Sequence, residues 1–275
     1  MPLSDRRRPA VAGSFYPADP GELEGLVGGF LSNVQAVPRP ARGAIAPHAG
    51  LIYSGQCAAH VFARVAIPPV VVVLAPNHTG RCGARGGVSV WARGAFETPL
   101  GTVPIAEALA EAFLARCELA SHDVLAHVAE HAIEVELPFL QALVAEVTVL
   151  PIVLAWDDWR RCEVVAEALA DLVAHWPQPV LLLASSDMTH YESAASAAAK
   201  DRKALDAIAR LDGAALLATC GRHNITMCGR GPAAVVTDAC RRLGASGATV
   251  ADYRHSGLVT GDDARVVAYA GVVIE

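Results

Sequence analysis

The sequence VVVVLAPNHTG, residues 70–80, decides the fold class. Its apolar, β-branched run is too short for a helix and has prolines on both sides, which predicts a strand covered on both faces of a sheet. A polar turn follows Pro76, directly after the carboxyl end of that strand. Ligands of open α/β sheets bind beyond the carboxyl ends of the strands, so His78 is a candidate functional residue.

The same pattern occurs at two further places in the chain. GAIAPHAG, residues 43–50, is a short apolar segment that ends in proline, His48 and glycine. VLLLA, residues 180–184, runs into a polar loop that contains Asp187 and His190. Strands of this kind would deliver the three loops to one edge of the sheet. The alternative is that the histidines are solvated loop residues and that Asp187 only caps the following helix.

Composition predicts a globular α/β protein. Hydrophobic residues make up 53% of the 275 residues and charged residues 18%, which provides a large core and excludes a disordered chain. We expect one domain over residues 1–275. The net charge of -6 argues against nucleic-acid binding. The basic cluster Arg6-Arg7-Arg8 is short, and we interpret it as a solvated arm.

Targeting and cross-linking signals are missing from the sequence. The N-terminus lacks the apolar stretch of a signal peptide and no apolar run is long enough to cross a membrane, so we expect a cytoplasmic protein. The seven cysteines fit neither a disulfide framework nor a CxxC zinc site, and we expect most to be reduced and buried. Cys228 precedes a helix N-terminus, where the helix dipole favours thiolate, although a structural thiol is the alternative.

Local patterns predict the remaining elements. Ser54 is expected to cap the helix that precedes the central strand. Residues 86–92 and 96–101 form two short strands that we interpret as a hairpin. Pro138 must lie near the first turn of its helix or kink it. Residues 250–253 and 265–273 close the sheet, with an antiparallel member among them.

The strand-end histidines indicate a metal site. Neutral imidazole is a common ligand of zinc, copper and non-haem iron, and two histidines with one anionic ligand leave positions open for substrate or oxygen. No local motif such as HExxH is present, so spacing alone does not decide the question. The candidates for the anionic ligand are Asp187, Glu134, Glu136 and Cys228. The two glutamates have the alternative of a solvated helix face.

Short motifs along nearly the whole chain resemble the Memo family in order and spacing. They are PHAG at 47–50, YSG at 53–55, NH at 77–78, EHAIE at 130–134, LPF at 137–139, SSD at 185–187, HY at 190–191, CG at 228–229, SG at 256–257 and GD at 261–262. Bacterial and archaeal members are known as AmmeMemoRadiSam system protein B. The family is similar in fold to the LigB-type class III extradiol dioxygenases, which bind Fe(II) through two histidines and a glutamate.

The resemblance implies a three-layer αβα sandwich with a central mixed, mainly parallel sheet. It also implies that His48, His78 and Cys228 bind the metal, with the cysteine in place of the dioxygenase glutamate. His190 matches the acid/base histidine, and we expect Asp187 to orient it for proton transfer. His131 belongs to the shared EHxxE motif, and we expect it to support the ligands or contact substrate.

The leading functional hypothesis is a redox protein with one metal ion, Fe(II) or copper, and zinc as a further option. A thiolate favours copper or zinc more than a carboxylate does, which weakens the inference to ring cleavage. One alternative is a catalytically silent scaffold that binds a peptide or a small anionic ligand. Another is a zinc hydrolase with His190 as base.

Expectations about partners come from composition and from the resemblance. We expect a small-molecule substrate or a peptide, and neither nucleic acid nor membrane. The resemblance implies a functional association with radical-SAM and AMMECR1-like proteins. An apolar-rich chain of this kind is also compatible with a homodimer.

Overall fold

The fold is built around a nine-stranded mixed sheet, which a computed structural model defines over the described residues 5–275. The strand order is β10-β12-β2-β9-β3-β8-β4-β7, and β11 pairs with β12 outside this path. A second sheet has the order β1-β5-β6. The strands are β1 (Arg6–Arg7), β2 (Gly43–Ala46), β3 (Val70–Pro76), β4 (Val88–Val90), β5 (Ala95–Thr98), β6 (Gly101–Pro104), β7 (Ala120–His122), β8 (Thr148–Leu154), β9 (Val180–Ser185), β10 (His190–Glu192), β11 (Ala248–His255) and β12 (Val266–Ile274).

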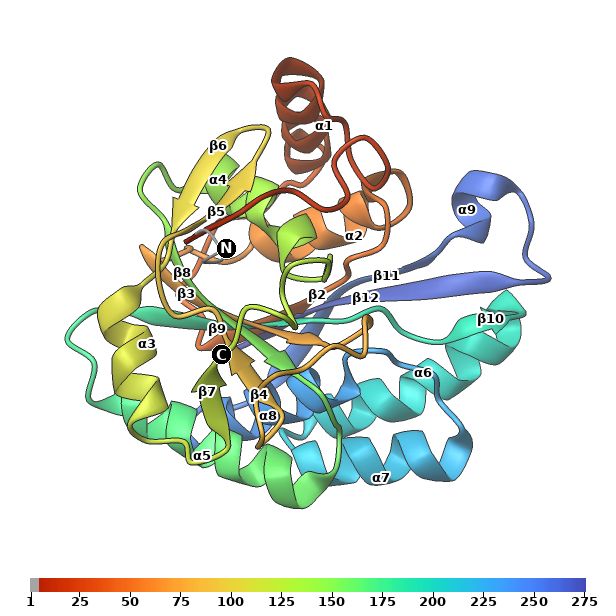
Figure 1. Ribbon diagram of the computed structural model, residues 1–275. Helices are drawn as coiled ribbons and strands as arrows, with labels where there is room; N and C mark the ends of the chain where they lie inside the picture. The colour runs from red at the N-terminus through yellow and green to blue at the C-terminus, as the bar shows by residue number, and fades with distance from the viewer. Residues whose placement is uncertain (1–4) are drawn as a thin grey trace.

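Helices cover both faces of the large sheet (Figure 1). In this view α1, α2 and α4 lie above the sheet, and α3, α5, α6, α7 and α8 lie below it. The helices are α1 (Pro20–Ser32), α2 (Leu51–Phe62), α3 (Glu107–Leu114), the 3-10 helix η1 (Glu134–Glu136), α4 (Leu137–Leu143), α5 (Trp159–Ala174), α6 (Ala194–Ala209), α7 (Gly213–His223), α8 (Arg230–Arg242) and α9 (Gly257–Thr260). The predicted α/β architecture with a helix-flanked sheet is therefore confirmed.

Strand β3 is buried along its whole length, as its sequence predicts. Val72 packs into the apolar cluster on the α5 and α8 side, whereas Val71 and Val73 pack into the cluster on the α2 and α4 side. Burying a valine side chain stabilises the fold by roughly 1.5–3 kcal/mol. The alternation of side chains along the strand thus joins both halves of the core.

Parallel pairing in the centre of the sheet explains why three loops meet at one edge. β2 pairs with β9, and β3 lies between β9 and β8, all in parallel. The carboxyl ends of β2, β3 and β9 therefore lie side by side, and they lead into His48, His78 and Asp187. Antiparallel pairs flank this centre, including the predicted pairing of the closing strand β12 with β11.

Three local predictions have different outcomes. Pro138 lies in the first turn of α4, as expected. The predicted Ser54 cap is wrong because α2 begins at Leu51, and the Ser54 hydroxyl instead donates to the Ala49 carbonyl at 2.8 Å from within the helix. The predicted hairpin of β4 and β5 is also wrong. β4 pairs with β7 and β8, whereas the turn at Gly94, with φ of 82°, sends the chain to pair as β5 with β6.

The interpretation of the basic N-terminal cluster as a solvated arm is wrong for Arg7. Its side chain is 1% exposed and forms a buried ion pair with Glu134. The same carboxylate accepts hydrogen bonds from the backbone N–H groups of Ala10 and Val11, at 2.8 and 3.1 Å, and from the Tyr16 hydroxyl. Glu134 is therefore fully engaged by the N-terminal segment, which excludes it as the anionic metal ligand.

Arg7 also fixes the segment that precedes η1. Its guanidinium donates to the backbone carbonyl oxygens of His127 and Glu130. A buried charge is tolerated only when it is paired and its hydrogen-bonding groups are satisfied. The N-terminal strand thus holds the loop that carries Glu130 and His131.

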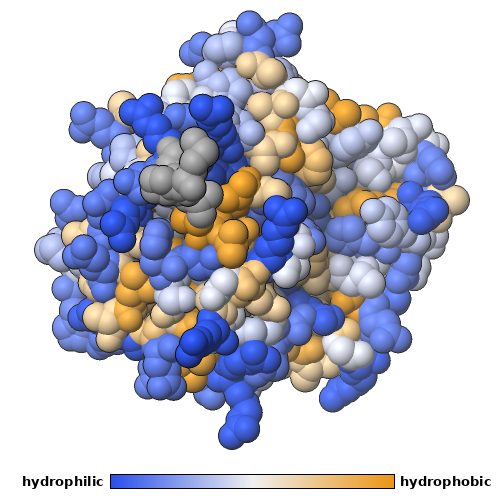
Figure 2. Space-filling model, in the orientation of Figure 1, coloured by the Kyte–Doolittle hydropathy of each residue, from blue (hydrophilic) through white to orange (hydrophobic). Residues whose placement is uncertain are grey.

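The remaining surface features are ordinary for a globular chain. Within residues 5–275 no helix is long and apolar enough to span a membrane. The seven cysteines, all of which lie in that range, are free thiols, and only Cys82 is exposed. On the face shown in Figure 2, apolar residues form several separate groups among polar ones.

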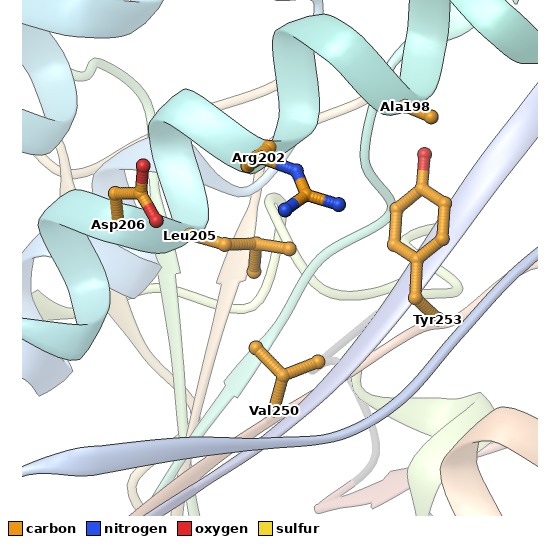
Figure 3. A pocket seen from close by; sticks show the side chains of 6 residues that line it. All are labelled: Ala198, Arg202, Leu205, Asp206, Val250 and Tyr253. Carbon is orange, nitrogen blue, oxygen red and sulfur yellow. The ribbon is translucent and has the colours of Figure 1, made fainter.

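A cavity of about 310 Å³ lies between α6 and β11. Figure 3 shows the Arg202 guanidinium beside Leu205 and facing the Tyr253 ring. The Tyr253 hydroxyl donates to the carboxylate of Asp201, at 2.7 Å. The cavity is lined by Ala198, Arg202, Leu205, Asp206, Val250 and Tyr253, none of which belongs to the histidine loops.

Candidate metal centre

Three histidines meet at the carboxyl edge of the central strands. One ligand nitrogen from each of His48, His78 and His131 lies within 4.8 Å of the others. The ring centroids are 5.1 Å apart for His48 and His78, 5.3 Å for His48 and His131, and 4.7 Å for His78 and His131. This group could hold a metal ion.

His48 presents its Nε2 atom to the cluster. The ring is buried, and Nδ1 lies 2.7 Å from the Ser185 hydroxyl. That hydroxyl also lies 2.8 Å from the carbonyl oxygen of Ala132, which can only accept a hydrogen bond. Nδ1 of His48 therefore carries the proton and donates to Ser185, which leaves the Nε2 lone pair available. Burial lowers the pKa of His48 well below its usual value, so the ring is neutral.

His78 is fixed by Glu130. Its backbone N–H and its Nδ1 donate to the two carboxylate oxygens at 2.7 and 2.8 Å. Burial opposes ionisation of both groups, but their hydrogen bond and mutual attraction outweigh it, so the pKa of His78 is raised and that of Glu130 is lowered. A carboxylate on the outer nitrogen is how proteins orient metal-binding histidines and increase their basicity.

His131 stacks on His78 with an interplanar angle of 24° and packs against the ring of Phe15, 4.7 Å away. Burial lowers the pKa of His131 and favours the neutral ring. From the sequence we expected His131 to support the ligands or contact substrate. The structure places it as close to His48 and His78 as a third ligand would be.

Cys228 lies beside His48. Its Sγ atom is 3.3 Å from His48 Nε2, and the backbone N–H of Asp187 donates to it at 3.2 Å. Two ligands that bind one ion at about 2.0–2.3 Å are themselves roughly 3–4 Å apart, so this separation fits a shared metal. The next position requires glycine, because a Cβ at Gly229 would lie 2.4 Å from the Ser185 carbonyl oxygen and 2.5 Å from the Ser186 Cβ.

The predicted thiolate at Cys228 is not the metal-free state. Burial and the charge of Asp187 raise the pKa of the thiol, and they outweigh the hydrogen bonds with Asp187, Ser186 and Gly229. Metal binding would release the thiol proton, as it does at other cysteine sites. The surroundings of Cys228 therefore favour the neutral thiol over the thiolate.

Asp187 holds the His48 loop rather than His190. Its carboxylate accepts the backbone N–H groups of His48 and Ala49 at 2.9 and 3.3 Å, and burial raises its pKa to about 6 against these hydrogen bonds. The expectation that Asp187 orients His190 is wrong. Thr226 does so, because its carbonyl oxygen lies 3.0 Å from His190 Nδ1 and its hydroxyl accepts the His190 backbone N–H at 2.8 Å.

The helix-cap alternative for Asp187 is wrong as well. Ser193 is the N-cap of α6, where its side chain accepts the backbone N–H of Ser196. The alternative of a solvated helix face is wrong for both glutamates, since Glu134 and Glu136 are fully buried. Long-range partners therefore decide the roles of all three carboxylates.

Comparison with known proteins shows the family of this chain. The family model described as Memo-like protein matches residues 7–273. The chain is 40% identical over 280 residues to the MEMO1 family protein MK0963 of Methanopyrus kandleri, which covers 97% of this chain and 98% of that protein. It is also 40% identical over 271 residues to a MEMO1 family protein of Aquifex aeolicus, with 97% and 98% covered. Because both matches extend over nearly the full length of the chains, this protein belongs to the Memo-like family.

Proposed function

We propose that this protein is a metal-dependent redox protein that holds one Fe(II) or copper ion on His48, His78 and Cys228, with His131 beside them. The observation that carries the proposal is the clustering of one ligand nitrogen from each of His48, His78 and His131 within 4.8 Å, with Cys228 Sγ 3.3 Å from His48 Nε2. Support comes from the outer hydrogen bonds of His48 and His78, which direct the Nε2 atoms toward a common centre.

The donor set favours a transition metal. Imidazole and thiol ligands suit iron, copper and zinc and are poor ligands for magnesium or calcium. A bound metal of this kind would supply redox chemistry to a small-molecule or peptide substrate. The proposal includes a relation in fold to the LigB-type extradiol dioxygenases. The mixed sheet between helices is compatible with that relation.

His190 is the proposed proton acceptor. Its Nδ1 faces the carbonyl oxygen of Thr226, which can only accept, so the neutral ring carries its proton on Nδ1 and has a free lone pair on Nε2. Support for this role comes from the sequence position of His190, three residues after Asp187, whose carboxylate accepts the His48 backbone N–H at 2.9 Å. The side chain can therefore take a proton from a substrate beside the metal.

Replacing His190 with alanine should reduce metal-dependent oxygen consumption by about 10²–10⁴-fold and leave the metal content unchanged, because general base catalysis contributes about that factor. The measurement is oxygen uptake by metal-loaded protein over a panel of oxidisable small molecules. His175→Ala is the matched control, since the His175 side chain is 69% exposed at the end of α5.

Equal oxygen uptake by metal-free and metal-loaded protein would contradict the redox proposal. Hydrolysis by zinc-loaded protein without oxygen uptake would replace it with the hydrolase alternative. Unchanged activity in His190→Ala would remove His190 from the mechanism.

A further inference from the structure

Glu136 is a buried carboxyl group that the proposed chemistry does not use. It lies in η1 and is fully buried. Its Oε1 atom is 2.6 Å from the Ser185 hydroxyl, and its Oε2 atom has no hydrogen-bond partner among residues 5–275. An ionised carboxylate with one bare, buried oxygen would carry a large desolvation penalty, whereas a neutral carboxylic acid needs a partner mainly for its O–H.

The Ser185 hydroxyl determines the direction of the hydrogen bonds that it shares with its three neighbours. The hydroxyl has one hydrogen and two lone pairs, and it contacts the Ala132 carbonyl, His48 Nδ1 and Glu136 Oε1. Since the Ala132 oxygen can only accept, the serine hydrogen belongs to that bond. The other two neighbours must then both donate to Ser185, which requires His48 to be protonated on Nδ1 and Glu136 to be protonated on Oε1.

The environment of Glu136 agrees with this assignment. Burial raises the pKa of Glu136 well above its usual value, and the nearby charge of Asp187 raises it further. The neutral state is therefore favoured both by the hydrogen-bond directions and by the electrostatics.

We propose, resting on the metal-site function above, that Glu136 is a positioning residue. As an uncharged carboxylic acid it donates to Ser185 and thereby fixes His48 with its Nε2 lone pair toward the cluster. His48 and His78 then differ in the charge of the group that orients each ring. The carboxylate of Glu130 makes His78 more basic, whereas the neutral pair of Ser185 and Glu136 orients His48 without adding negative charge.

The first test is a Co(II) titration of the purified full chain and two variants, Glu136→Gln and Glu136→Leu. Glutamine keeps an uncharged N–H donor for Ser185, so its affinity should stay within about threefold of wild type. Leucine removes the donor and should weaken Co(II) binding about 10–100-fold, the usual effect of losing an outer partner of a ligand. Glu146→Gln, at an exposed position, is the control.

Two results of the titration would overturn the inference. Equal weakening in both variants would mean that the site requires the negative charge of an ionised Glu136. Wild-type affinity in Glu136→Leu would mean that the side chain only fills space. Thermal unfolding of each variant confirms that it is folded, and leucine is compatible with the fold because it removes the unpartnered Oε2.

The second test needs no metal. Infrared difference spectra of the metal-free wild type and Glu136→Gln, at pH 7, should contain the C=O stretch of a protonated carboxyl group that is lost in the variant. Absence of this band would overturn the inference whether or not the protein binds metal. If wild type bound no Co(II), the metal proposal would fail, and the band would still report the protonation state of Glu136.

Discussion

Replacing His48 with alanine should lower the affinity of the protein for Fe(II) by more than about 100-fold, because loss of an outer partner alone costs about 10–100-fold and this change removes the ligand itself. His48 also has a close contact on each of its two ring nitrogens. Its ring lies between Ser185 Oγ at 2.7 Å and Cys228 Sγ at 3.3 Å. The measurement is an anaerobic Fe(II) titration of metal-free protein.

His175→Ala serves as the control in this titration, since it removes an exposed imidazole without touching the cluster. It should bind Fe(II) as wild type does. Wild-type affinity in His48→Ala, or equal weakening in both variants, would contradict the assignment of His48 as a ligand.

Replacing Arg7 with methionine should lower the free energy of unfolding by about 3–5 kcal/mol, because it leaves the buried Glu134 carboxylate without its counter-charge. The ion pair is 1% exposed on the arginine side and 0% on the glutamate side. The measurement is urea denaturation, in which the midpoint should fall and the slope should stay the same.

Two further variants test whether the lost ion pair is the cause. Arg8→Met changes an exposed neighbour and should shift stability by no more than about 0.5 kcal/mol. Glu134→Leu combined with Arg7→Met should be more stable than Arg7→Met alone, because no uncompensated charge remains. If Arg7→Met and Arg8→Met unfolded alike, the N-terminal strand would not hold the loop of His131.

The strands that deliver the site could be predicted from local sequence. The apolar runs that end before His48 and His78 are bounded by proline and glycine, and their lengths exclude helices. Their parallel direction follows from the helix that connects them, so the meeting of the two histidines at one edge of the sheet could also be expected. Asp158 is the N-cap of α5 and accepts the Arg161 backbone N–H at 3.2 Å, which is a local feature of the same kind.

Partners that are distant in sequence could not be predicted. Arg7 and Glu134 are separated by 127 positions and Ser185 and Glu136 by 49, and no periodicity connects them. The sequence likewise did not show that β4 pairs with β8 and not with β5. Strand pairing depends on which edge of the sheet is open once the core has formed.

His131 shows where motif reading stops. The dipeptide Glu130-His131 gives no indication that both side chains contact the ring of His78 in different ways. In the structure Glu130 turns to the Nδ1 of His78, while His131 stacks on the same ring. The position of His131 beside His48 and His78 depends on the loop that Arg7 holds, so the motif alone could not predict it.

The central claim is that the histidine cluster binds a redox-active metal. It is tested most directly by elemental analysis and electron paramagnetic resonance of anaerobically purified protein, with Cys228→Ser and His131→Ala beside wild type. We predict close to one equivalent of iron or copper in wild type. The metal should be lost, or its spectrum altered, in whichever of the two variants has lost a metal-binding side chain. Wild-type protein without metal, or metal that is indifferent to both substitutions and to His48→Ala, would contradict the claim.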